Sequence, residues 1–154
     1  MAFVTNDVQQ LSFDDPVFHL TEREKKFLEK SWSKYFADHI FPNIKEEEFA
    51  VLYSKKSSRP NAPVNVTVGA LLLKEVFALT DEEIVEAMIF DFRFQYALHT
   101  TSYQDQPISE RSLSRFRSRN FAHKAKTGTD LLHNCFEGLS EEIAELLKFT
   151  TLIE

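Results

Sequence analysis

Val66-Thr-Val-Gly-Ala-Leu-Leu-Leu-Lys-Glu-Val-Phe-Ala78 is apolar on nearly every side of a helix, and Lys74 and Glu75 are its only charged residues. A helix of that kind lies inside a protein. The chain has 154 residues, enough for one domain with a real core. It contains three glycines, which leaves few of the tight turns that hairpins need. We therefore expect a single all-α domain built around a buried helix from Val66 to Ala78.

The next segment predicts a second helix after a short turn at Leu79. Thr80 and Glu83 have the spacing of a capping box. The two helices together have a helix-turn-helix-like outline, in which the second helix usually enters the major groove of DNA. Phosphates would repel the glutamates that this helix exposes, so we assign DNA recognition to a later helix. Its apolar side holds Ile84, Val85, Ala87, Met88 and Ile89, and its polar side holds Glu82, Glu83 and Glu86.

The segment from Phe90 to Leu98 alternates aromatic or aliphatic residues with mostly polar ones, which by its period indicates a strand. The sequence offers no second strand of comparable quality, and an unpaired strand leaves its backbone groups unsatisfied. We predict a bent helical segment that packs in the core. Two alternatives stay open, namely a strand over residues 89–98 and a platform for single-stranded nucleic acid that stacks bases on Phe92, Phe94 and Tyr96.

The segment from Pro107 to Lys126 reverses the charge of an acidic chain. The formal net charge is −6, yet residues 106–128 hold six Lys and Arg and one acid. Ser109 is a good N-cap, so a helix is expected to begin here. On a helical wheel one side carries Leu113, Phe116 and Asn120, and a separate stripe carries Arg111, Arg115, Ser118, Arg119 and Ala122. We expect the first side to pack and the second to face DNA.

The candidate DNA contacts come from this basic helix and from the loop at residues 54–63, which has the composition of an exposed connection. A solvated linker explains the loop equally well. In the helix the candidates are Arg111, Arg115, Arg117, Ser118, Arg119, Lys124 and Lys126, and in the loop they are Lys55, Lys56 and Arg59.

The N-terminal third predicts an extended arm over residues 1–20, packed by its aromatic residues, and then helices over residues 21–53. A capping box at Thr21 begins a helix that we expect to run from Glu22 to His39. Pro42 ends it, and Asn43 with Glu46 offers a cap for a short helix that buries Phe49, Leu52 and Tyr53. Residues 129–154 predict two C-terminal helices, one closed by Gly138 and one capped by Ser140.

Several functions are disfavoured by the sequence. No apolar run is long enough to span a membrane, the N-terminus is not a signal peptide, and the single cysteine, Cys135, cannot form an internal disulfide. We therefore expect a cytoplasmic protein without a membrane partner. His133 and Cys135 lie about 200° apart on a helix, so they cannot share one metal ion. No phosphate loop or nucleophile motif is present, so we expect no catalytic residue, cofactor or small-molecule ligand.

A family resemblance rests on Arg59-Pro60, Pro63, Leu71-Leu72-Leu73, the run Leu79 to Ile84, the run Asp91 to Leu98, and Ser112-Leu-Ser-Arg-Phe-Arg117. Together these residues resemble the N-terminal domain of bacterial insertion-sequence DDE transposases. The resemblance covers residues 59–120, and the flank from Leu20 to Tyr53 is similar more loosely.

The resemblance implies a helical, DNA-binding front domain that positions the protein on transposon-end duplex DNA in the bacterial nucleoid. In that family it precedes a ribonuclease-H-like catalytic domain whose three acids hold divalent metals. The chain ends at Glu154 before such a domain, so we expect an excised domain or a truncated product that does not catalyse strand transfer and needs no metal itself. A homodimerisation module is the alternative reading, with the aromatic surfaces of residues 1–53 as its interface.

Overall fold

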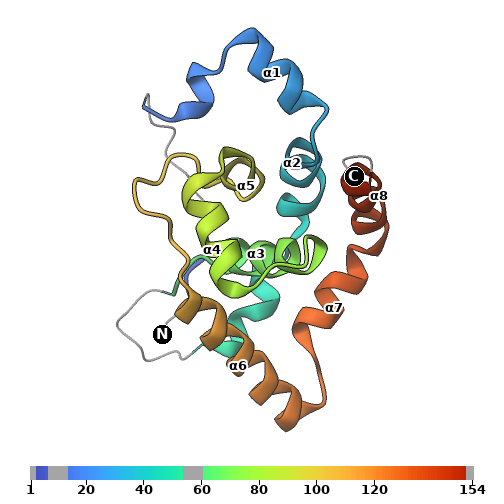
Figure 1. Cartoon of the computed structure of the whole chain (residues 1–154). Helices are drawn as coiled ribbons and strands as arrows, with labels where there is room; N and C mark the ends of the chain where they lie inside the picture. The colour runs from blue at the N-terminus through green and yellow to red at the C-terminus, as the bar shows by residue number, and fades with distance from the viewer. Residues whose placement is uncertain (1–2, 7–13, 54–60, 152–154) are drawn as a thin grey trace.

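The structure is a computed structural model, and it describes residues 3–6, 14–53 and 61–151. The described part consists of helices and connections and contains no strand, which confirms the all-α class (Figure 1). In chain order the elements are η1 (Pro16–His19), α1 (Glu22–Glu29), α2 (Trp32–Tyr35), η2 (Phe36–Ile40), η3 (Phe41–Asn43), η4 (Glu46–Leu52), α3 (Val64–Val76), α4 (Asp81–Phe90), α5 (Phe92–Ala97), α6 (Glu110–Thr127), α7 (Leu131–Gly138) and α8 (Ser140–Thr151).

Helix α3 lies at the centre, as expected, and packs against η4, α4 and α6 (Figure 1). It buries Val64 and every residue from Val66 to Leu73. The helix begins at Val64 and ends at Val76, two residues earlier than predicted at each end. Ala78 adopts the left-handed conformation at φ 54° and turns the chain toward α4. A Cβ on Gly69 would lie 2.6 Å from the side chain of Leu98, so the small residue lets α3 approach the end of α5.

The segment after α3 forms two short helices rather than a strand. The capping box of Thr80 and Glu83 is present and begins α4. The chain bends at Asp91, whose carboxylate accepts a hydrogen bond from the Arg93 N–H at 2.9 Å and caps α5. The prediction of a bent helical segment is therefore confirmed, and the strand alternative is wrong. Phe94 packs in the core as expected, with its ring edge to face against that of Trp32 and the centroids 5.0 Å apart.

The single helix predicted from Glu22 to His39 is wrong. Its expected capping box at Thr21 is present, but α1 ends at Glu29. The Ser31 hydroxyl then accepts from the Ser33 N–H at 3.1 Å and caps a new helix, α2, which continues into the π-helical turn η2. A serine that bonds to the local backbone competes with helix continuation, and this explains the break.

The cap predicted at Asn43 is also wrong. Its side-chain amide donates to the carbonyl of His39 at 2.7 Å, so Asn43 closes the preceding turn instead of opening the next helix. The following element, η4, is a 3-10 helix without a side-chain cap. It still buries Phe49 and partly buries Leu52, as its pattern predicted.

The N-terminal arm is described at residues 3–6 and 14–20. The Phe3 ring packs on Tyr53 with centroids 5.9 Å apart, as an arm packed by aromatic residues would require. Phe18, in contrast, is 54% exposed, and η1 replaces an extended chain at that point.

The C-terminal part follows the predicted order. Gly128, at φ 80°, ends α6 in the left-handed conformation that favours glycine. The predicted cap at Ser140 is wrong by one residue, since the Leu139 carbonyl already accepts from the Ile143 N–H at 2.9 Å. In α7, Cys135 is buried, and burial raises the pKa of its thiol to about 11. Among the described residues, no helix is both long and apolar enough to cross a membrane.

Candidate nucleic-acid interface

Helix α6 begins with two serines that cap each other. The Ser109 hydroxyl accepts from the Ser112 N–H at 3.1 Å, and the Ser112 hydroxyl accepts from the Ser109 N–H at the same distance. Ser109 is thus the N-cap that the sequence predicts, while the part played by Ser112 was missed because glutamate or glutamine usually fills that place. These two hydrogen bonds fix where α6 begins, and the start of the helix sets the position of each arginine along it.

The inner face of α6 is the predicted one, with Leu113, Phe116 and Asn120 buried. Phe116 packs on the ring of Phe49 with centroids 5.6 Å apart. The Asn120 amide donates to the Asp130 carboxylate at 3.0 Å, and its carbonyl oxygen accepts from the Leu132 N–H at 3.3 Å. These contacts hold α6 against η4 and the start of α7, so its rotation about its own axis is fixed.

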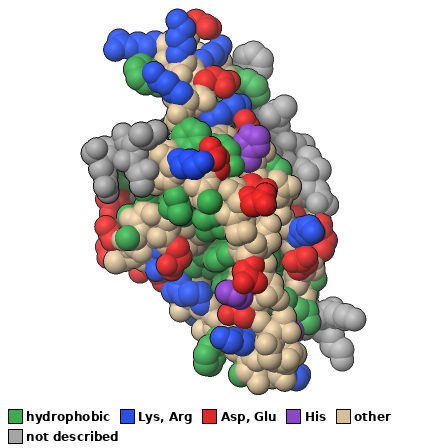
Figure 2. All heavy atoms as spheres, turned by 90° about the vertical axis from the view of Figure 1, so that its right-hand side faces the viewer, with side chains coloured by type: hydrophobic (Ala, Val, Ile, Leu, Met, Phe, Trp, Pro, Cys, Tyr) green, Lys and Arg blue, Asp and Glu red, His purple; other side chains and the backbone are tan. Residues whose placement is uncertain are grey.

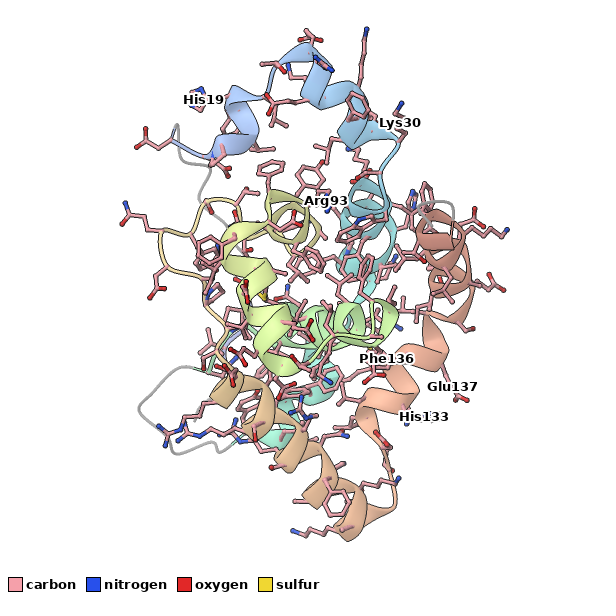
Figure 3. All side chains as sticks on the ribbon, viewed as in Figure 1. His19, Lys30, Arg93, His133, Phe136 and Glu137 are labelled. Atoms are coloured by element: carbon pink, nitrogen blue, oxygen red, sulfur yellow. The ribbon has the colours of Figure 1, made fainter. Side chains whose placement is uncertain are left out.

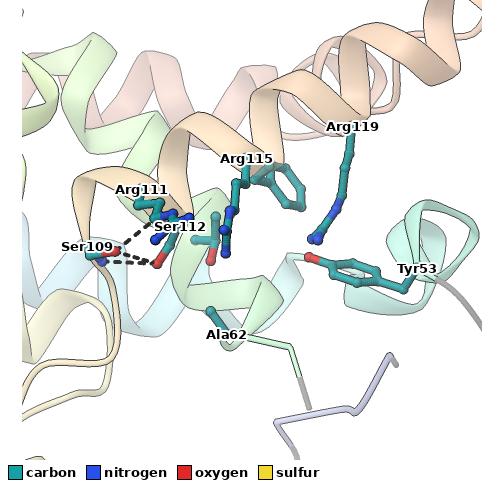
Figure 4. A pocket seen from close by; sticks show the side chains of 9 residues that line it. Tyr53, Ala62, Ser109, Arg111, Ser112, Arg115 and Arg119 are labelled. Atoms are coloured by element: carbon teal, nitrogen blue, oxygen red, sulfur yellow. Dashed lines mark hydrogen bonds between the residues drawn. The ribbon is translucent and has the colours of Figure 1, made fainter. Parts of the chain in front are cut away.

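Arg111, Arg115 and Arg119 lie on one side of α6, where they line a shallow pocket opposite Tyr53 (Figure 4). We call these three residues the arginine row. The pocket has a volume of about 80 Å³ and no carboxylate in its lining. Within the described part of the chain, neither Arg111 nor Arg115 forms an ion pair. Among the described residues, Arg111 and Arg115 therefore present positive charge that no carboxylate compensates.

Tyr53 holds the last member of the row. The Arg119 guanidinium lies over the Tyr53 ring, 5.0 Å from its centroid. Burial raises the pKa of Tyr53, and the positive charge of Arg119 partly offsets that rise. Tyr53 was predicted only as an apolar residue of the second helix. Its contact with Arg119 joins residues 66 positions apart, and no local pattern indicates it.

Arg117 points to the opposite side of α6 and pairs with Asp81 of α4. One guanidinium nitrogen donates to the carboxylate at 2.9 Å, and a second nitrogen contacts the other oxygen. The Arg117 hydrogen bond lowers the pKa of Asp81, and Lys74, 3.8 Å away, adds a further attraction. Arg117 thus ties the two helices together. Its predicted contact with DNA stays a prediction.

The other candidate residues lie apart from the arginine row. Ser118 and Lys126 are exposed on α6, and the Lys124 ammonium lies 3.8 Å from the Asp130 carboxylate. Lys55, Lys56 and Arg59 fall outside the described residues. The chain on either side of them, at Tyr53 and Ala62, borders the pocket of the arginine row.

No cluster of three or more His, Cys, Asp and Glu side chains that could hold a metal ion occurs in residues 3–6, 14–53 and 61–151. The expectation that this chain needs no metal stays a prediction.

These features define an all-α domain with a basic helix anchored on a buried core. The family model of the transposase domain DUF772 matches residues 22–119, from the start of α1 to the last arginine of the row. The match covers more than half of the chain, so the chain belongs to this transposase domain family. The resemblance seen in the sequence is thereby confirmed at the level of the family. No curated protein and no solved structure matched the chain.

Proposed function

We propose that this domain binds double-stranded DNA, and that it positions a transposase on the ends of its element through α6. One observation carries the proposal: Arg111, Arg115 and Arg119 stand together on one side of a well-anchored helix, and no carboxylate lines their pocket. Arginines in such a row are suited to phosphate oxygens, since each guanidinium presents a fork of donors and keeps its charge. Membership of a transposase family makes DNA the expected polyanion.

The outward face of α6 is suited to close approach. Ser114, Ser118 and Ala122 are exposed and small, and their spacing places them on the side of the helix away from buried Asn120. A helix with small outer residues can enter the major groove without steric conflict, while longer side chains at its edge reach the backbone. We assign Ser118 to the groove side and the arginine row to the phosphates.

The charges around α6 also orient the DNA. Helix α4 lies along the Arg117 side and exposes Glu82, Glu83 and Glu86. Phosphates approaching on that side would be repelled, whereas the Tyr53 side offers three arginines. The DNA backbone therefore runs along the pocket between α6 and Tyr53, and Lys126 extends the positive surface toward the end of α6.

A binding assay at several salt concentrations tests this function. Fluorescence anisotropy would compare duplexes carrying the terminal sequence of the parent element with a scrambled duplex. Each phosphate contact contributes about 0.9 to the slope of log affinity against log salt. Replacing all three arginines of the row by alanine should therefore flatten the slope by about 2.7.

The matched control removes three exposed cations from α1, namely Arg23, Lys25 and Lys26. This variant has the same net charge as the arginine variant, and its slope should stay close to that of the wild type. If the triple arginine variant remains folded and keeps the wild-type affinity and slope, α6 is a solvated surface and the proposal is wrong.

The single-stranded alternative has weaker support. Its platform needs Phe92, Phe94 and Tyr96 free for stacking, but Phe94 is 7% exposed and packs on Trp32 and Phe77. The dimerisation alternative, through the aromatic surfaces of residues 1–53, stays a prediction.

A further inference from the structure

Phe121 is a large apolar residue on the surface of α6. Its side chain is 72% exposed, although α6 has a buried face made of Leu113, Phe116 and Asn120. Phe121 follows Asn120 by one residue, about 100° around the helix, so it cannot join that face. Among the described residues, it belongs neither to the core nor to the apolar residues that pack against the core. Single exposed apolar residues are common, but the surroundings of this one distinguish it.

The flank of α6 that carries Phe121 has little net charge. Arg117 and Lys124 lie about one turn before and after Phe121 on this side of the helix. Arg117 donates to the carboxylate of Asp81 at 2.9 Å, and the Lys124 ammonium lies 3.8 Å from the carboxylate of Asp130. Both cations that border the ring therefore face an acid of the same chain. A phosphate would find little attraction on this flank, and Phe121 is suited instead to a neutral apolar group.

Small side chains leave the ring accessible from outside. Ser114, Ser118 and Ala125 are exposed, and their spacing puts all three within about 60° of Phe121 around the helix. Side chains on a helix lean toward its N-terminus, so the ring extends toward Ser118, the residue assigned to the groove side. Figure 2 shows apolar and basic side chains together on the surface at the lower end of the molecule, where α6 ends.

The neighbouring helix α7 directs exposed charged residues away from this flank. His133 and Glu137 pair with each other, with the His133 Nε2 3.3 Å from the carboxylate. Figure 3 shows both on the side of α7 that faces away from α6. The Glu137 carboxylate therefore adds little repulsion to DNA that approaches Phe121.

We propose that Phe121 contacts the 5-methyl group of a thymine in the major groove and gives the domain a preference for that base pair. The methyl group is the apolar feature that thymine presents in this groove, and phenylalanine is among the side chains that contact it. The inference rests on the proposed function, since Phe121 reaches a base only if α6 lies in the groove. The two flanks of α6 then have different tasks: the arginine row holds phosphates, and Phe121 reads a base.

A methyl-deletion scan with the full chain tests this contact. Each duplex carries the terminal sequence of the parent element with a single thymidine replaced by deoxyuridine, which lacks the methyl group and keeps the base pair. At one position or more, the wild type should lose about fourfold in affinity by fluorescence anisotropy, the effect of one methyl group removed from an apolar contact. Phe121→Ala should bind the unmodified duplex about tenfold more weakly. At the sensitive positions it should show no further loss, because the two changes remove the same contact.

Two controls accompany the scan. Phe18→Ala removes a ring that is 54% exposed on η1, at the opposite end of the molecule from α6 (Figure 1), and should bind every duplex as the wild type does. The salt slope of Phe121→Ala should equal that of the wild type, because the substitution removes no charge.

The outcomes separate this contact from the proposed function. If the arginine variant flattens the salt slope but no deoxyuridine weakens the wild type, the function stands and the thymine contact is wrong. If Phe121→Ala loses affinity yet stays as sensitive to deoxyuridine as the wild type, the ring meets something other than a methyl group, and the thymine contact is again wrong. A wild-type chain that does not bind duplex DNA at low salt would overturn both proposals.

Discussion

Helices α4 and α6 are neighbours on the same core helix, but they differ in what they present to solvent. Each begins with a capping box and each packs on α3. Helix α4 exposes Glu82, Glu83 and Glu86, while α6 carries the arginine row. The order of elements would favour the second helix of the pair, α4, as the one that meets DNA. The distribution of charge favours α6, and it outweighs the order because the proposed partner, DNA, is a polyanion.

The two helices are joined where their charges meet. Arg117 pairs with Asp81, the first residue of α4, so its charge does not add to the positive surface of the arginine row. This pair neutralises the acid closest to α6 and leaves the glutamates further along α4 unpaired with α6. The Arg117–Asp81 pair therefore contributes to the difference in exposed charge between α4 and α6.

The largest effect is expected from the helix that supports both. Leu73 of α3 is fully buried, and Leu73→Ala should lower the free energy of unfolding by about 2 to 5 kcal/mol through lost burial and a cavity. Urea unfolding would measure it, with Val51→Ala as a control at a residue 62% exposed. A loss under about 0.5 kcal/mol, as at a surface site, would show that α4 and α6 do not rest on α3.

A smaller effect is expected from the pair that joins the two helices. The coupling between Asp81 and Arg117 in a double-mutant cycle should be about 0.5 to 1 kcal/mol, since the Arg117 side chain is 40% exposed. The pKa of Asp81 is lowered in the fold. Its stabilisation is thus present above the unfolded carboxyl pKa and is lost as pH falls from about 4 through the folded pKa.

The measurement is the same cycle, with Asp81→Asn and Arg117→Met, repeated at pH 7 and at pH 3. The coupling should shrink at pH 3. A coupling that does not change with pH would mean that the carboxylate charge does not hold α6 to α4.

A substitution at Tyr53 separates the positioning of the Arg119 side chain from the proposed contact of Arg119 with phosphate. Tyr53→Ala should weaken DNA binding about threefold, because Arg119 then has to be ordered on binding. The salt slope should remain that of the wild type, since the arginine is still present. Arg119→Ala, in contrast, should flatten the slope by about 0.9. Equal slopes for wild type and Arg119→Ala, measured by anisotropy, would remove Arg119 from the interface.

The smallest effect is expected on the α4 side. Glu82→Gln and Glu86→Gln should raise DNA affinity about twofold at most, because the proposed DNA backbone runs on the Tyr53 side of α6, away from these glutamates. Glu141→Gln on α8 serves as a control for the same change in net charge. If either α4 variant bound DNA several times more weakly than the wild type, the result would indicate that α4, and not α6, is the helix that enters the groove.

Much of this fold follows from local sequence. The capping boxes at Thr21 and Thr80, the buried run around Leu72, and the inner face of α6 are all set by residues within one or two helical turns of each other. The segment at Phe94 alternates as a strand does, but the sequence offers no partner strand, and this excluded a strand there.

The features that were missed have two physical sources. The helix break at Ser31 depends on whether a hydroxyl bonds to its own backbone, which is a competition of small energies that a helical pattern does not resolve. The contacts of Arg117 with Asp81 and of Arg119 with Tyr53 bring together residues far apart in the chain. The helical wheel placed Arg119 on the stripe away from the packed face, but it could not show what either arginine would contact.

The burial of Cys135 in α7 also bears on chemical labelling. At pH 7 a thiol with a pKa of about 11 is ionised in only about one molecule in ten thousand, whereas an exposed thiol with a pKa of about 8.5 is ionised about 300 times more often. Maleimides react with the thiolate. A cysteine introduced at Ser118 or at Phe27 could therefore carry a fluorophore or spin label selectively in the otherwise native chain, with Cys135 left in place.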